Sequence, residues 1–273
     1  MTSVAGQKRA KEVARAKYER QQAKRDAQRR ARRRNGWIAG GVVALIVVLV
    51  VAFALWPEST DAPEPTALAS KPPAPVSAPA GVSCTQATPA SASGQYPAPT
   101  AMKLQPGSAM TLDTNCGTVV FGLDVKAAPK STKGLAFLAS KGWYNNGNCH
   151  RLTVEGIYVV QCGAGQPSGQ GDPGFTVPDE NLPPAGAGGS GQYPSGTVAM
   201  ANRGPGTSSS QFFIVYKDTQ LPPNYSIVGQ VTSGMNVIEY VASQGVADSS
   251  SNPGDGPPAQ PLVIKTATVR NGP

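Results

Sequence analysis

The 273-residue sequence has one histidine, four cysteines and only 6% aromatic residues. A serine hydrolase would have to use His150 as its base, and no G-x-S-x-G nucleophile motif accompanies this residue. No two cysteines form the close C-x-x-C pair that is typical of structural zinc sites. We therefore interpret His150 as a structural residue beside a strand, and we expect no metal and no cofactor.

Positive charge is scarce outside the N-terminus, although the formal net charge is +8. Residues 1–36 contain 13 Lys and Arg against 3 acids, so the rest of the chain is slightly acidic. Residues 8–34 lack Gly and Pro and can form a helix on anionic lipid. Because an apolar run follows, lipid contact explains this tail more simply than nucleic-acid binding, which we do not expect.

The apolar run Trp37–Trp56 has 20 uncharged residues bracketed by tryptophans. A helix of this length spans about 30 Å, the thickness of a bilayer core, and Trp suits its two interfaces. A signal peptide is the alternative, but its apolar core is usually shorter and no convincing cleavage site follows. The sequence predicts a basic cytoplasmic tail over 1–36, a single transmembrane helix over 37–56, and an extracytoplasmic remainder in the cell membrane.

A proline-rich segment and all four cysteines follow the predicted span. Residues 57–83 hold seven prolines and hardly a large apolar residue, which predicts a disordered linker. An even number of cysteines in an oxidising compartment predicts two disulfides. Spacing alone does not fix their pairing. We favour Cys84 with Cys116, which would tie the linker to the domain, and Cys149 with Cys162 across neighbouring strands.

After a pre-domain segment, residues 84–101, the sequence changes to short β-rich runs with frequent turns. Pro129–Gly142, which opens with Pro and a Ser cap, and Gly234–Gly245, which closes on Gly, predict two helices. These features predict a mainly β domain over 102–272, a closed antiparallel barrel capped at its ends. The predicted strands are Gly117–Asp124, Gly156–Gly163, Gly196–Ala201, Ser210–Tyr216, Ser226–Val231 and Leu262–Val269.

Two short motifs do not support other functions. Gly186–Gly191 matches G-x-G-x-x-G, but no strand precedes it and no helix follows, so we interpret it as a surface loop rather than a dinucleotide site. Asp179–Asn181 lies between prolines and predicts a turn.

The segment Met200–Phe213, "MANRGPGTSSSQFF", contains no Cys, His or carboxylate. It follows "CHRLTVEGIYVVQCG" and "DEN", and "QLPPNYSIVGQVTSGMNVIEYV" comes after it. In order and spacing these segments resemble the cyclophilin family of peptidyl-prolyl isomerases over about residues 102–272, most of all its bacterial membrane-anchored branch. The resemblance implies an eight-stranded closed barrel with a helix over each end and an active groove on the outer face.

The resemblance also implies the roles of individual residues. Rotation about an X-Pro bond needs no nucleophile, because its barrier of about 18–20 kcal/mol is amide resonance. An arginine that hydrogen-bonds the prolyl nitrogen can lower this barrier, since it stays charged and offers several donors in one plane. The implied catalytic residues are Arg151, Gln161 and Phe213, and the implied substrate-binding residues are Ala201, Asn202, Gln211, Leu221, Tyr225 and Tyr158.

The chain departs from the family pattern around the predicted groove. The turn before Gly156 is longer, and one extra residue precedes Gln161, so Ile157, Tyr158 or Val159 can occupy the groove; we assign Tyr158. Tyr225 stands where a pocket His is usual. Gln220 stands where many eukaryotic members have Trp, which implies only weak cyclosporin binding.

Two functions follow from the sequence. The first is an isomerase that assists the folding of extracytoplasmic proteins, with proline-containing polypeptides as substrates. The second is a weakly active or inactive module that binds proline segments in the cell envelope. Arg151 favours the first, whereas Gln220 and the altered turn leave room for the second.

Overall fold

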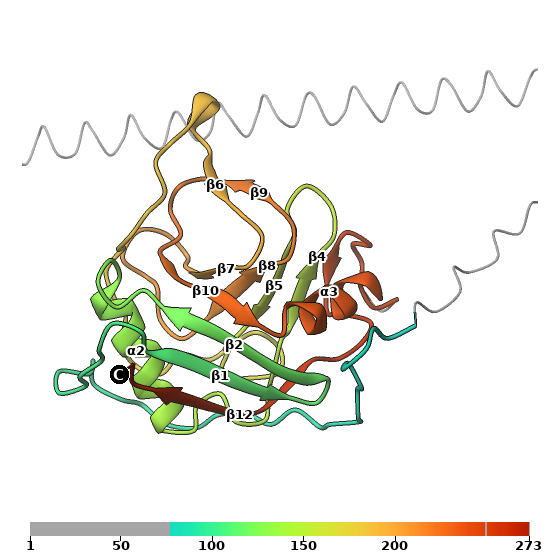
Figure 1. Ribbon diagram of the computed structural model, residues 1–273, viewed down its shortest axis with the longest axis horizontal. Coiled ribbons are helices and arrows are strands. Elements are labelled where there is room, and N and C mark those ends of the chain that lie inside the picture. Colours follow the sequence, from blue (N-terminus) through green and yellow to red (C-terminus); the bar gives the residue numbers. More distant parts are fainter. Residues whose placement is uncertain (1–76, 249, 273) are drawn as a thin grey trace, which may run out of the picture. The chain divides into compact units, whose positions relative to one another are not determined.

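A computed structural model describes residues 77–248 and 250–272 of the chain (Figure 1). The predicted tail, membrane span and most of the predicted linker lie outside these residues. No helix among the described residues has the length and apolar character needed to cross a membrane.

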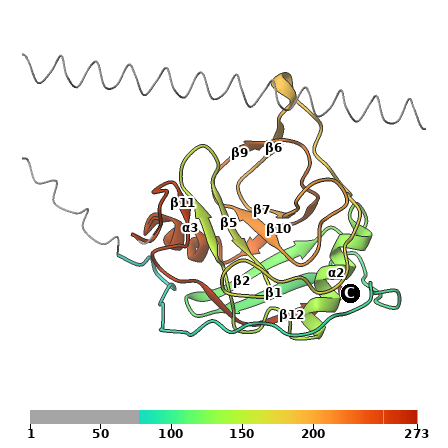
Figure 2. The same ribbon diagram turned by 180° about the vertical axis from the view of Figure 1, so that it is seen from behind.

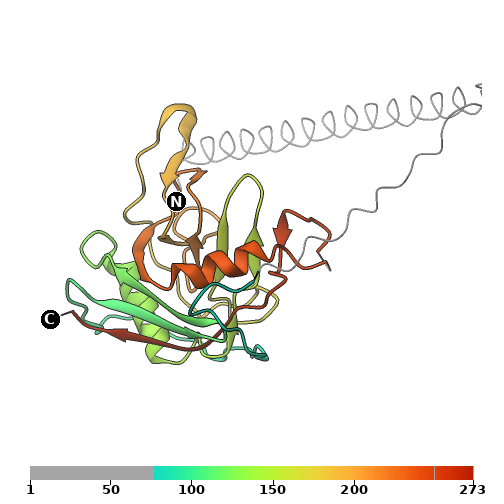
Figure 3. The same ribbon diagram turned by 45° about the vertical axis from the view of Figure 1, so that its right-hand side comes forward.

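Ten strands form one curled antiparallel sheet, and two more form a small separate sheet (Figure 1). The large sheet has the spatial order β11 (Asp255–Gly256), β4 (Arg151–Thr153), β5 (Val159–Cys162), β8 (Phe212–Val215), β7 (Thr197–Met200), β10 (Ile227–Ser233), β2 (Gly117–Leu123), β1 (Ala109–Thr114), β12 (Val263–Arg270) and β3 (Gly147–Asn148). The small sheet pairs β6 (Gly191–Tyr193) with β9 (Thr219–Leu221). A 3₁₀ turn, η1 (Ala187–Gly189), lies in a loop that projects from the domain (gold in Figure 3).

Alternating burial explains why these segments are strands. In β1 every second residue, such as Met110 and Leu112, is buried, and in β2 Val119 and Phe121 point into the same core. The Phe121 ring lies 5.9 Å from that of Phe212 on β8. Burial of each such side chain contributes about 1.5–3 kcal/mol, so the inward rows of opposite walls stabilise the curl. The six predicted strands are confirmed as β2, β5, β7, β8, β10 and β12.

The predicted closed eight-stranded barrel is wrong. The structure has a curled open sheet, or half-barrel, instead. Its order ends at β11 and β3, and no pairing among the described strands joins these two ends. The chain itself links β3 to β4 through Cys149 and His150, and the Cys149 N–H donates to Leu262 O at 2.8 Å. The chain therefore connects β3, at one end of the strand order, to β4, which lies next to β11 at the other end. No hydrogen-bonded pairing joins the described strands β3 and β4.

Helices α2 (Pro129–Ser140) and α3 (Met235–Ser243) confirm the two predicted helices and lie at opposite ends of the sheet (Figures 1 and 2). Pro129 begins α2, a position where its missing N–H costs nothing. The predicted Ser cap is replaced by Glu180, whose carboxylate accepts from the N–H groups of Lys130 and Ser131 and from the Ser131 hydroxyl. Part of the predicted "DEN" turn therefore caps a helix from a distance.

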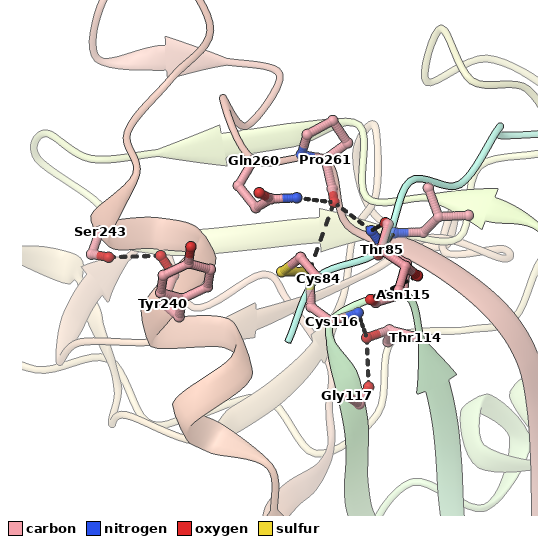
Figure 4. Close-up of a disulfide and its surroundings, with 11 residues drawn as sticks. Cys84, Thr85, Thr114, Asn115, Cys116, Gly117, Tyr240, Ser243, Gln260 and Pro261 are labelled. Atoms are coloured by element: carbon pink, nitrogen blue, oxygen red, sulfur yellow. Dashed lines mark hydrogen bonds between the residues drawn. A yellow bond between two sulfur atoms is a disulfide. The ribbon is translucent and has the colours of Figure 1, made fainter. Parts of the chain in front are cut away.

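Residues 82–96 run along the domain as a strap (teal in Figures 1 and 2). Val82 is 7% exposed and belongs to the core. The Cys84–Cys116 disulfide holds the start of the strap, and Asn115 Nδ2 beside it donates to Thr85 O at 2.8 Å (Figure 4). Further on, the Tyr96 N–H donates to Pro173 O at 2.6 Å. The strap therefore belongs to the folded domain.

Both disulfides follow the predicted pairing. Cys149–Cys162 joins the residue after β3 to the last residue of β5. Because Arg151 and Gln161 lie within two residues of these cysteines, this crosslink spans the two strands that carry the predicted catalytic pair.

Candidate active site

Cross-strand register places three predicted catalytic residues in one row. Arg151 on β4 is opposite Gln161 on β5, which is opposite Phe213 on β8. Directly opposed residues share a face of the sheet, and the next row, which includes Leu152, lies in the core. The predicted row therefore lies on the outer face of the curl.

A relay of side-chain hydrogen bonds connects this row to the neighbouring loop. Arg151 Nη1 donates to Gln161 Oε1 at 3.2 Å, and Gln161 Nε2 donates to Gln211 Oε1 at 2.8 Å. Gln211 Nε2 in turn donates to Gly169 O at 3.0 Å. The predicted residues Arg151, Gln161 and Gln211 are thus brought together, with both amides oriented by the relay.

Asp255 is a fourth member of this group, and it was not predicted. Arg151 Nε and Nη2 donate to Asp255 Oδ1 and Oδ2, each at 2.7 Å. The hydrogen bonds raise the pKa of Arg151 and lower the pKa of Asp255. Asp255 lies in a Gly- and Pro-rich segment of the sequence that indicates only a turn, so nothing local marks it as a partner of Arg151.

An apolar cluster lies beside the relay on the same face. Phe213 is 4% exposed and Leu221 8%, and the Tyr225 ring meets the Phe213 ring edge-on at 5.5 Å. The structure therefore unites the three residues predicted to form a proline pocket. The buried members are Val159, Tyr193, Ala199, Phe213, Val215 and Leu221, and Ile157, Ala201, Tyr225 and Ile227 pack against them.

Tyr158 does not belong to this apolar cluster, and its role in substrate binding stays a prediction. Its ring packs edge-on against Tyr216 at 5.9 Å, and Lys217 Nζ lies 4.4 Å from its centroid. Ile157 and Val159, on either side of it, contact the cluster instead. Successive strand residues point to opposite faces, so the extra residue in this turn decides which side chains reach the groove.

Tyr193 fixes the backbone beneath Tyr225. Its hydroxyl donates to Tyr225 O at 3.1 Å and accepts from the Tyr225 N–H at 3.2 Å. Burial raises the pKa of Tyr193 to about 12, so this hydroxyl stays protonated and can keep both hydrogen bonds. Tyr193 was not among the predicted site residues, because β6, which carries it, has only three residues and shows no period.

A pocket of about 270 Å³ adjoins the relay. His150 contributes to its wall, and burial, followed by the charge of Arg151, lowers the pKa of His150 to about 4. The ring of His150 lies so close to Gly169 that any side chain there would collide with it, and Gly169 has a φ of +84°. The lining includes His150, Gln161, Ser168, Gly169, Gly171, Asp172, Ala201, Asn202, Arg203, Thr207, Ser209, Ser210 and Gln211.

The backbone at Ala201 and Asn202 is only partly available to a ligand. The Ala201 N–H donates to Gln211 O at 2.9 Å, so this donor is occupied. The Asn202 side chain donates to Asn224 O at 2.7 Å and accepts from the Gly204 N–H at 3.1 Å. Within the described part of the chain, the backbone N–H and carbonyl of Asn202 have no hydrogen-bond partner, so both can bind a peptide.

In residues 77–248 and 250–272, no group of three or more His, Cys, Asp and Glu side chains could hold a metal ion. The arrangement offers an oriented cation, an apolar cluster and free backbone groups near one another, which suits binding of an uncharged peptide without covalent chemistry.

Comparisons with known proteins give one family. The model for "Cyclophilin type peptidyl-prolyl cis-trans isomerase/CLD" matches residues 109–269. The probable peptidyl-prolyl cis-trans isomerase B of Mycobacterium leprae is 37% identical over 164 residues, which cover 57% of this chain and 55% of the relative. The protein of the same name from Mycobacterium tuberculosis is 33% identical over 175 residues, which cover 59% of this chain and 54% of that relative. The chain thus spans about half the length of these relatives.

Two crystal structures of one protein also match part of the chain. A crystal structure of a cyclophilin type peptidyl-prolyl cis-trans isomerase from Cryptosporidium parvum has 26% sequence identity, covers 61% of this chain and 99% of its own, and aligns with a TM-score of 0.49. A second crystal structure of that protein, in the presence of the dipeptide Ala-Pro, has 25% sequence identity and a TM-score of 0.48. It covers 60% of this chain and 99% of its own.

Proposed function

Because the chain belongs to the family of cyclophilin-type peptidyl-prolyl cis-trans isomerases, we propose that its described domain catalyses rotation about X-Pro bonds in polypeptides. The observation that carries this proposal is the row of Arg151, Gln161 and Phe213 on the outer face of the sheet. This row puts an oriented cation beside an apolar cluster. A crystal structure of a similar protein in the presence of Ala-Pro supports the choice of substrate class.

The proposed mechanism depends on the donors that Arg151 has left. A guanidinium carries five N–H bonds. Asp255 accepts two of them and Gln161 one, so two can reach a ligand. As the peptide bond twists, its nitrogen loses conjugation and its lone pair becomes an acceptor. An N–H of Arg151 that donates to this nitrogen stabilises the twisted state more than either planar isomer, which is the requirement for catalysis.

The other residues hold the substrate in place. Phe213, Leu221 and Tyr225 bind the proline ring by apolar contact. The free backbone groups of Asn202 fix the flanking chain, so rotation occurs about a bond whose two ends are held. Such positioning needs no acid, base or nucleophile.

One observation favours the second function, binding of proline segments without useful turnover. The carboxylate of Asp255 partly neutralises the charge of Arg151, which weakens its attraction for the twisted amide. NMR exchange spectroscopy on the full chain in detergent, with an Ala-Pro peptide, separates the two functions. Uncatalysed exchange takes tens to hundreds of seconds. Acceleration at catalytic protein concentration supports the isomerase, binding without acceleration supports the module, and absence of both contradicts the proposal.

We also propose that the domain acts outside the cell membrane, where it assists the folding of secreted and envelope proteins. The uncharged run 37–56, the basic tail before it and the pairing of all four cysteines in disulfides support this location. The tail would lie on anionic lipid. Protease added outside intact cells should release the domain by cutting within residues 57–76; a domain that survives while an external marker is digested would refute the location.

A further inference from the structure

The Arg151–Asp255 ion pair has a geometry that restricts the arginine strongly. Both oxygens of Asp255 accept, from Nε and Nη2 of Arg151 at 2.7 Å each. A bidentate pair of this kind fixes the guanidinium plane as well as its position, whereas the single hydrogen bond to Gln161 allows rotation. The two side chains are 38% and 35% exposed, so the pair itself is expected to add little to folding stability.

Asp255 is itself held by a braced loop. It belongs to β11, which pairs with β4 through Asp255 opposite Thr153. The Asp255 N–H donates to Asn252 O at 3.2 Å, and Ser250 Oγ donates to Asp255 O at 2.9 Å. Asn252 Oδ1 also accepts from the Gly254 N–H at 3.0 Å. The carboxylate is therefore presented to Arg151 by a backbone that three separate contacts define.

We propose that Asp255 is a positioning residue for the isomerase reaction, which orients Arg151 so that its two remaining N–H bonds face the substrate. This inference rests on the proposed function. Asp255 accepts hydrogen bonds from Nε and Nη2 of the guanidinium, and Gln161 accepts one from Nη1. One N–H of Nη1 and one of Nη2 therefore remain for the substrate. Preorganised donors cost no reorganisation during the reaction, and a misplacement of about 1 Å can cost about a hundredfold in rate.

The test uses the full chain and the variant Asp255→Asn, which keeps the side-chain size but removes the charge. We expect kcat to fall by about tenfold to a hundredfold, with peptide affinity and melting temperature nearly unchanged, because orientation affects the twisted state most. Asp113→Asn is the matched control, since Asp113 forms an exposed ion pair with Lys265 at 3.6 Å, away from the relay. It should leave kcat unchanged.

A double-mutant cycle separates positioning from a structural role. If Asp255 acts through Arg151, then Asp255→Asn should have no further effect on kcat in the Arg151→Ala background. A parent-like kcat for Asp255→Asn, or an equal loss in both backgrounds, would overturn the inference. If Asp255→Asn has a parent-like kcat while the parent is active and Arg151→Ala is impaired, only the role of Asp255 is wrong and the proposed function is retained. An inactive parent refutes the proposed function itself.

A second route covers the case in which Asp255→Asn does not fold. Ser250→Ala and Asn252→Ala keep the carboxylate but loosen its brace, so each should lower kcat more than it changes peptide affinity. If both variants fold and retain the parent kcat, the positioning role is wrong.

Discussion

Arg151 and Gln161 face each other across β4 and β5, and Arg151 Nη1 lies 3.2 Å from Gln161 Oε1. This pair lies on the outer face of the curled sheet, one residue away from side chains that are fully buried. Chemistry and folding therefore depend on different rows of the same strands. Substitution of a polar residue in the outer row, such as Arg151, should affect turnover, and substitutions in the inner row should affect stability.

Arg151→Ala should lower the catalysed isomerisation rate by about two to three orders of magnitude, because one preorganised charged donor supplies about 3–4 kcal/mol to a transition state. Peptide affinity and melting temperature should stay near those of the parent. Arg270→Ala, at the exposed end of β12, is the control. If Arg151→Ala isomerises an Ala-Pro peptide within a fewfold of the parent, the arginine mechanism is wrong and the binding module takes its place.

Phe213→Ala should weaken peptide binding and stability together. The ring is buried in the apolar cluster and contacts both Tyr193 and Tyr225, so its loss removes pocket wall and packing. Removal of a buried Phe side chain typically costs about 3–5 kcal/mol. Urea unfolding and peptide titration measure the two effects. Phe121→Ala, in the main core, is the control and should lower stability without lowering peptide affinity. If folded Phe121→Ala and folded Phe213→Ala lose the same peptide affinity, Phe213 does not form part of a substrate pocket.

His150 should make stability depend on pH. Its pKa is lowered from 6.5 to about 4 in the folded protein, so the unfolded chain binds the proton first as the pH falls. Stability should therefore decrease by about 2 kcal/mol between pH 7 and pH 5, and the loss should continue until the pH passes the folded pKa. Urea unfolding at both pH values, on the parent and on His150→Gln, gives the comparison. The same pH dependence in both proteins would show that His150 is not responsible.

Cyclosporin should bind the domain weakly, and Gln220→Trp should strengthen it. Gln220 is exposed on β9, next to Leu221 of the apolar cluster, and offers little apolar surface. An added aromatic side chain contributes about 1.5–3 kcal/mol when buried, or about tenfold to a hundredfold in affinity. Isothermal titration calorimetry on both proteins measures the difference. Equal dissociation constants would mean that residue 220 does not contact the ligand.

The longer elements could be predicted because their patterns are local. Six strands, two helices and both disulfide pairs agree with the sequence interpretation. Strand β1 was missed, although Met110 and Leu112 alternate with half-buried residues and gave a period-two signal. The other missed strands, β3, β4, β6, β9 and β11, have two or three residues each, too few to show any period.

The site residues that could be predicted also lie in local sequence patterns. Arg151, Gln161, Gln211, Phe213 and Leu221 lie in motifs whose order and spacing fix their places, and the structure brings them together. Tyr158 lies outside the apolar cluster and its assignment stays a prediction, because the sequence does not show where the extra residue of this turn is absorbed.

The sequence by itself indicated a cyclophilin-type domain through its resemblance to that family, and it determined the longer strands and both helices, because a motif and strand alternation are local properties. Only the tertiary structure decided that the sheet is a curled half-barrel, that Glu180 caps α2, and that Asp255 meets Arg151. Residues 151 and 255 are separated by 104 positions and join only when β11 pairs with β4. Such contacts depend on how the whole sheet curls, and no short stretch of sequence specifies that.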